Sequence, residues 1–146
     1  MEISSQTLLY RVETEDILPT IAWFFPNRKL AEEYLYRYKH EYLGIPLEEL
    51  KIRVYQPKED LFLPILDSEF TAHTLDLYIQ RMDPTFIPQI LVENVNNYHT
   101  ATWFLDHNLP GWVAFRGSDR DFGLWTRSPN YYEIMLTHPE RKILLV

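Results

Sequence analysis

The sequence predicts an α+β fold, and the order of its predicted elements is the main reason. Short apolar runs typical of strands occur near both ends of the chain, and an amphipathic helix follows the second of them. Strands and helices do not alternate regularly, as they would around a parallel sheet. With 146 residues the chain is long enough for one domain with a sizeable core, so we expect a single domain over residues 1–146.

The helix is the clearest element of the first half of the chain. Asn27 suits an N-cap and Gly44 a C-cap, which predicts a helix from Arg28 to about Leu43. Residues at spacings of three and four should form its buried face, namely Leu30, Ala31, Tyr34, Leu35, Tyr38 and Tyr42, while the charged residues, Lys39 among them, should face solvent. The predicted strands nearby are Gln6–Val12, Ile21–Phe25 and Lys51–Tyr55, and Leu61–Leu66 is an edge strand or extended connection containing Pro64.

The second half is predicted to contain three helices and three strands. The helices run from Ser68 to about Met82, from about Pro88 through Tyr98, and from Thr100 to His107; the strands are Gly111–Phe115, Tyr131–Leu136 and Lys142–Val146, with a loop over Arg116–Arg127. Strand alternation places Glu133 on the same face as Tyr131 and Met135. Such a glutamate lies either in water at a sheet edge or in a cleft.

Composition excludes several kinds of site and partner. The net charge of −7 disfavours a broad nucleic-acid-binding surface, although a local basic patch is compatible with it. The absence of cysteine excludes disulfides and thiolate ligands and weakly favours a reducing compartment. No apolar run is long enough for a bilayer span and no signal peptide is evident, so we expect a cytoplasmic protein without a membrane anchor. The five histidines form no metal-binding motif, and no phosphate-binding glycine loop is present.

Two residues stand out as candidates for chemistry. Arg11 ends an apolar strand, and aromatic residues end the next one, an arrangement that suits a cleft for a flat, anionic ligand. The simpler interpretation is that Arg11 pairs with Glu13 or Glu15, as strand-end arginines often do. Glu133 has the same two interpretations, a cleft carboxylate or a solvated one.

The order of these segments resembles the mono-ADP-ribosyltransferase family, which includes bacterial toxins and the catalytic domain of poly(ADP-ribose) polymerases. An early strand ends in Arg11, where the family places Arg or His, and the aromatic strand Trp23-Phe24-Phe25 leads into a helix rich in alanine and tyrosine. Pro110-Gly111-Trp112-Val113 resembles a strand entry common in the family, and Tyr132-Glu133-Ile134-Met135-Leu136 resembles the strand that carries its catalytic glutamate.

The resemblance implies split antiparallel sheets with flanking helices and an NAD-dependent transferase of ADP-ribose to a protein or nucleic-acid end. Arg11 would bind NAD and act with Glu133 in catalysis, Glu133 would stabilise the ribosyl cation, and Phe24, Phe25 or Tyr34 would stack on the nicotinamide. The family's Ser-Thr-Ser motif is replaced by Trp23-Phe24-Phe25. Tyr131 stands where arginine-specific transferases have Gln or Glu, so no arginine acceptor is implied.

Two other functions compete with this one. The same scaffold without catalysis would be a nucleotide- or protein-binding module, which a ligand would stabilise without releasing nicotinamide. An inhibitory or structural interaction protein would instead present an exposed aromatic patch, and no cleft would contain both Arg11 and Glu133.

Overall fold

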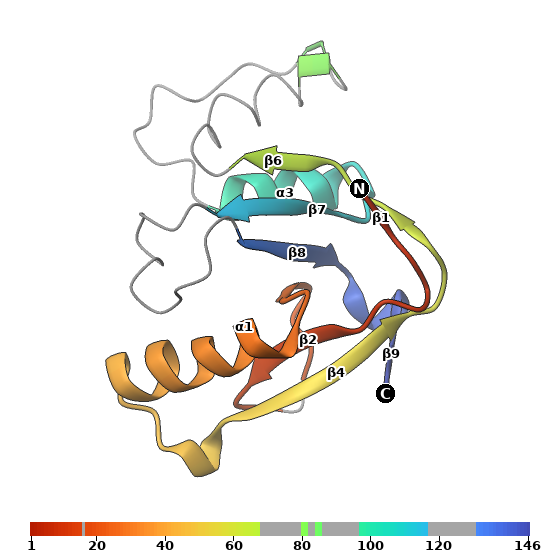
Figure 1. The fold of residues 1–146 in the computed structure, drawn as a ribbon. Coiled ribbons are helices and arrows are strands. Elements are labelled where there is room, and N and C mark those ends of the chain that lie inside the picture. Colours follow the sequence, from red (N-terminus) through yellow and green to blue (C-terminus); the bar gives the residue numbers. More distant parts are fainter. Residues whose placement is uncertain (16, 68–79, 82–83, 86–96, 117–130) are drawn as a thin grey trace.

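The computed structural model describes residues 1–15, 17–67, 80–81, 84–85, 97–116 and 131–146, which form a mixed α+β fold (Figure 1). The described strands form sheets of two, three and four strands, and all but one of their pairings are antiparallel. The predicted α+β class is therefore confirmed. The exception is the parallel pair β6–β7, which the sequence did not indicate.

The three-stranded sheet brings together segments from the start, middle and end of the chain. Strand β2 (Leu9–Glu13) pairs with β4 (Lys51–Pro57), and β4 pairs with β9 (Ile143–Leu145). A short two-stranded sheet is formed by the antiparallel strands β1 (Glu2–Ile3) and β5 (Leu61–Phe62).

Glu133 lies on an inner strand of the four-stranded sheet. Its order is β3 (Ile21–Phe24), β8 (Tyr131–Thr137), β7 (Gly111–Arg116) and β6 (Ile65–Asp67). The extended segment expected over Leu61–Leu66 is divided between β5 and β6, because Leu63 and Pro64 separate the two strands.

The two larger sheets are joined where β2 passes β3. Tyr10 and Phe25 exchange two backbone hydrogen bonds, 2.9 and 2.6 Å long, in an isolated antiparallel bridge. A core cluster drawn from all three sheets fills the space beside this bridge: Ile3, Leu9, Ala22, Phe24, Tyr55, Leu63, Val113, Ile134, Leu136 and Ile143. Burial of this shared apolar surface is the main force that holds the sheets together.

The predicted first helix is present, but its winding changes halfway along. It starts as α1 (Arg28–Glu33), where the Leu30 N–H donates to the Asn27 side chain over 2.9 Å, and continues as a π-helix, η1 (Tyr34–Tyr42). Gly44 ends it with a φ of +74°, as expected of a C-cap. The expected burial of Tyr42 is wrong, since its side chain is 75% exposed. The wider π turn shifts the later residues away from the positions that α-helical spacing assigns them.

The second well-described helix, α3 (Asn97–Asp106), packs on the four-stranded sheet (Figure 1). Its side chains Trp103 and Phe104 contact a cluster that includes Trp112 and Met135. This helix begins three residues before the predicted Thr100 and ends one before His107. Short 3₁₀ turns occur at Leu47–Glu49 (η2) and Pro139–Arg141 (η3).

Several predicted elements fall wholly or mostly on residues outside the described ranges. These are the helix over Ser68–Met82, the helix from Pro88 with its inward residues Ile90, Leu91 and Val95, and the loop over Arg116–Arg127, of which only Arg116 is described, at the end of β7.

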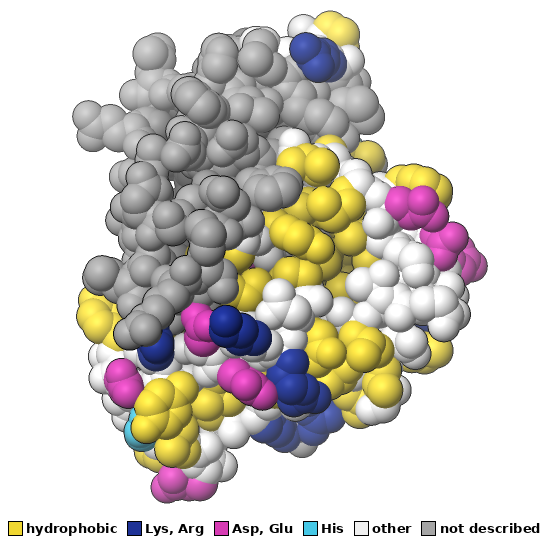
Figure 2. Space-filling model, in the orientation of Figure 1, with side chains coloured by type: hydrophobic (Ala, Val, Ile, Leu, Met, Phe, Trp, Pro, Cys, Tyr) yellow, Lys and Arg dark blue, Asp and Glu magenta, His cyan; other side chains and the backbone are white. Residues whose placement is uncertain are grey.

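The described surface mixes both signs of charge. On the face seen in Figure 2, acidic and basic side chains lie next to one another over the region of α1, β2 and β4. Within the described part of the chain, no helix is both long enough and apolar enough to cross a bilayer.

Gly111, at the start of β7, provides a test of the sheet geometry. Its φ is +149°, and an added Cβ would collide with the backbone carbonyl of Met135 on β8. Gly44 also has positive φ, but nothing lies within 4 Å of its would-be Cβ. We expect Gly111→Ala to lower the free energy of unfolding by about 3 kcal/mol or more and Gly44→Ala by about 1 kcal/mol. Urea denaturation of both variants measures the difference, and equal losses would contradict the close β7–β8 approach.

Candidate functional site

The candidate site begins with two arginines that face each other across β2 and β4. Arg11 and Arg53 are direct partners in the antiparallel register, a position in which like charges repel. Glu13 compensates for this repulsion: its carboxylate oxygens lie 3.3 Å from Arg11 Nε and 3.1 Å from Arg53 Nε. The simpler interpretation of Arg11, a pair with Glu13, is therefore present in the structure.

Glu13 is only 4% exposed, so its charge depends on these partners. The Tyr55 hydroxyl donates a further hydrogen bond to Glu13 Oε1 over 2.7 Å. Burial and this hydrogen bond raise the pKa of Tyr55 above its ordinary value. The carboxylate is thus held by two guanidinium groups and one phenol.

Arg11 also reaches from its own sheet to the next one. Its Nη1 donates to the backbone oxygen of Trp23 in β3 over 3.2 Å. The side chain is 16% exposed, and burial lowers its pKa while the neighbouring Glu13 opposes that shift. The guanidinium therefore lies at the junction of the two sheets with part of its surface accessible.

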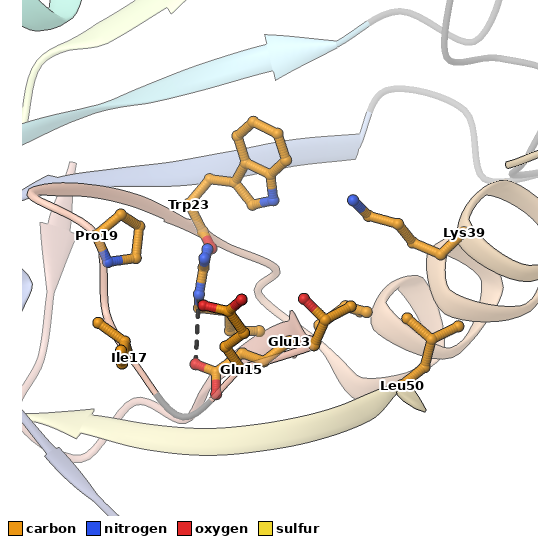
Figure 3. A pocket seen from close by; sticks show the side chains of 10 residues that line it. Glu13, Glu15, Ile17, Pro19, Trp23, Lys39 and Leu50 are labelled. Atoms are coloured by element: carbon orange, nitrogen blue, oxygen red, sulfur yellow. Dashed lines mark hydrogen bonds and ion pairs between the residues drawn. The ribbon is translucent and has the colours of Figure 1, made fainter. Parts of the chain in front are cut away.

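A cavity of about 320 Å³ opens beside Arg11 (Figure 3). Charged, aromatic and aliphatic side chains share its wall: Arg11, Val12, Glu13, Thr14, Glu15, Ile17, Pro19, Trp23, Lys39 and Leu50. A volume of this size is near the lower end of the range for small-molecule sites.

Lys39 reaches this cavity from the π-helix. Figure 3 shows its side chain extending from the helix toward Trp23. Its Nζ lies 5.6 Å from the centre of the Tyr34 ring, within the range of a cation–π contact. Burial, and then the charge of Arg11, lower the pKa of Lys39. The expectation that Lys39 faces solvent is therefore wrong. It assumed α-helical spacing, whereas in a π-helix residue i+5 lies one turn above residue i.

Tyr34 lies within electrostatic reach of both predicted catalytic residues. The tyrosine is 3% exposed, and its pKa is raised first by burial and then by the negative charge of Glu133, while Arg11 lowers it. Arg11 and Glu133 come from different sheets. Their charges act on the same phenol, one from β2 and the other from β8.

Glu133 belongs to a buried face of the four-stranded sheet. Its exposure of 6% rules out a solvated strand glutamate. The predicted alternation of β8 is confirmed, since Ile134 and Leu136 join the core shared by the sheets, while Tyr131 and Met135 pack on the opposite face. Tyr131 contacts the cluster beneath α1–η1 and Met135 contacts the one beneath α3. Glu133 shares the sheet face of Tyr131 and Met135, and it is not among the described residues that line the cavity beside Arg11.

The residues predicted to stack on the nicotinamide are not among the described residues that line the cavity beside Arg11. Phe24 and Phe25 are fully buried, Phe24 in the core between the sheets and Phe25 beneath the helix, with no exposed ring face. Their contact with nicotinamide, like that of the buried Tyr34, stays a prediction. Trp23 is the aromatic that lines the cavity. It pairs with Met135 in the β3–β8 register and so shares the face of Glu133, a relation that strand parity could have indicated.

Among the described residues, no group of three or more His, Asp or Glu side chains could hold a metal ion. No protein-family model, curated protein or solved structure matches the chain. Function must therefore be inferred from the geometry of the site.

The contribution of the Glu13 carboxylate can be separated from that of its hydrogen bond. Glu13→Gln keeps an acceptor for Tyr55 but leaves Arg11 and Arg53 opposed, and we expect it to cost about 3 kcal/mol of unfolding free energy. Tyr55→Phe removes one hydrogen bond and should cost about 1 kcal/mol. Chemical denaturation of both variants gives the comparison, and a Glu13→Gln loss no larger than that of Tyr55→Phe would contradict the charge-bridging role.

The raised pKa of Tyr34 predicts a loss of stability at alkaline pH. The folded chain retains the phenol proton where the unfolded chain, with a pKa of about 10, loses it. The unfolding free energy should therefore fall above about pH 10, with up to about 1.4 kcal/mol per pH unit from this group. Tyr34→Phe removes that contribution, so its stability should fall less steeply than that of the wild type. Urea denaturation between about pH 8 and 11 tests this, and parallel curves would contradict it.

Proposed function

We propose that the chain transfers ADP-ribose from NAD to a macromolecular acceptor. In this proposal Arg11 binds NAD, and Glu133 stabilises the ribosyl cation and accepts a hydrogen bond from a ribose hydroxyl. The fold would then be of the ADP-ribosyltransferase type. The acceptor would be a protein or a nucleic-acid end, and the absence of cysteine agrees with a cytoplasmic setting.

The observation that supports this proposal most is that Arg11 and Glu133 both lie within electrostatic range of the buried Tyr34 phenol. The two residues are far apart in the chain and come from separate sheets, yet the pKa of Tyr34 responds to both charges. An anion-binding arginine and a buried carboxylate within reach of one phenol suit a ligand with a diphosphate at one end and a developing cation at the other.

The chemistry required of these residues is a substitution at the ribose C1′ of NAD. The bond from C1′ to the nicotinamide nitrogen breaks, and its electron pair leaves with the nicotinamide, which becomes neutral. An acceptor nucleophile then forms a bond to C1′ and loses its proton to solvent. Charge at C1′ is greatest between these events, so a carboxylate in a site that excludes water stabilises it most effectively.

A non-catalytic binding module is the second candidate, and the burial of Glu133 favours it. The carboxylate is 6% exposed, and Phe24 and Phe25 expose no ring face to a ligand. In addition, Arg11 already pairs with Glu13 and donates to Trp23. A module of this kind would bind a nucleotide or protein through the cavity beside Arg11 and leave NAD intact.

Nicotinamide release from NAD tests the catalytic proposal. We expect the wild-type chain to release nicotinamide, with water as the acceptor if no other is present. Glu133→Gln should reduce the rate by about 100-fold or more because it removes the charge while keeping the shape. Glu32→Gln, on the exposed side of α1, is the matched control and should keep the wild-type rate.

Thermal stabilisation by NAD, measured in parallel, distinguishes the two candidates. Stabilisation without nicotinamide release would favour the binding module over the transferase. Equal release by wild type and by folded Glu133→Gln would contradict the role of Glu133.

A further inference from the structure

The cavity beside Arg11 contains a second cation that the proposed reaction does not yet use. Lys39 projects into it from η1 (Figure 3). Arg11 borders it from β2. A partly buried lysine normally has a carboxylate partner, because removing an ammonium from water is costly. Among the described residues, however, no carboxylate lies within 4.0 Å of Lys39 Nζ, and its recorded contact is the face of the Tyr34 ring.

Arg11 retains hydrogen-bonding capacity on its side of the cavity. Its Nε faces Glu13 and its Nη1 donates to the Trp23 carbonyl, which accounts for part of the five-donor guanidinium. Glu13 is shared with Arg53, so one carboxylate serves two arginines. Glu13 therefore neutralises Arg11 only in part.

Among the described residues, Glu15 is the other carboxylate on the cavity wall, and its position limits where an anion can bind. It is exposed, so solvent and salt screen its charge more than those of the buried groups. An anion would therefore lie on the Arg11–Lys39 side. Trp23 forms the wall toward which Lys39 points, and its indole offers apolar surface to a flat ring.

From this arrangement we propose that Lys39 binds the diphosphate of the dinucleotide together with Arg11, and that the cavity accepts the ADP-ribose portion against Trp23. The proposal rests on the proposed function for the identity of the ligand and adds the residue that recognises its anionic part. A cavity of about 320 Å³ suits part of a dinucleotide. Lys39 acts here as a binding residue and takes no part in bond breaking.

Isothermal titration with ADP-ribose, and separately with inorganic pyrophosphate, tests the proposal. We expect Lys39→Met to weaken ADP-ribose binding at least tenfold and Lys39→Arg to restore most of it, since the arginine keeps the positive charge. Lys29→Met is the matched control, because Lys29 is an exposed lysine on the same helical segment. The affinity of this variant for ADP-ribose should equal that of the wild type. Pyrophosphate should compete with ADP-ribose for the wild-type site.

The outcomes distinguish a failure of the proposed role of Lys39 from a failure of the proposed transferase activity. If NAD is not cleaved but Lys39→Met loses ADP-ribose binding, the anion site stands and the transferase proposal fails. If NAD is cleaved in a manner that depends on Glu133 but folded Lys39→Met keeps the wild-type KM for NAD, the role of Lys39 is overturned. Absence of ADP-ribose binding by the wild-type chain at millimolar concentration would also overturn it.

Discussion

The Glu13 carboxylate is the interaction on which the rest of the site depends. The register of β2 and β4 sets Arg11 directly opposite Arg53, and the buried Glu13 carboxylate offsets the repulsion between them. The same anion faces Nε of Arg11, which leaves the Nη donors for other partners. One of them reaches the carbonyl of Trp23, and the guanidinium thereby links the two larger sheets at the edge of the cavity.

The π winding of η1 is the second constraint. It allows Tyr34, Tyr38 and Tyr42 to stack with centroid distances of 5.1 and 5.7 Å, forming a column of rings that runs from the core to solvent. It also sets Lys39 one turn above Tyr34 rather than on the outer face. Long π segments are rare and often occur at functional sites, which agrees with a helix that contributes a side chain to the cavity.

The sequence could predict the features that follow from local periodicity. Period-two alternation correctly separated Glu133 from Ile134 and Leu136, and the Asn27 cap located the start of the helix. It could not reveal Lys39, because no local pattern distinguishes π from α winding. Nor could it show that Phe24 and Phe25 are buried from both sides while Trp23 lines a cavity, since that depends on which sheets enclose β3.

The site lies where three parts of the fold meet. Arg11 comes from the three-stranded sheet, Glu133 from the four-stranded sheet and Lys39 from the π-helix. Lys39 lies over the Tyr34 ring, and the charges of Arg11 and Glu133 act on the Tyr34 phenol. A ligand that bridges these charges would favour the closed arrangement of the two sheets over any looser one. In the proposed site, the same buried charges that make the junction costly without a ligand would give an anionic ligand its strongest contacts.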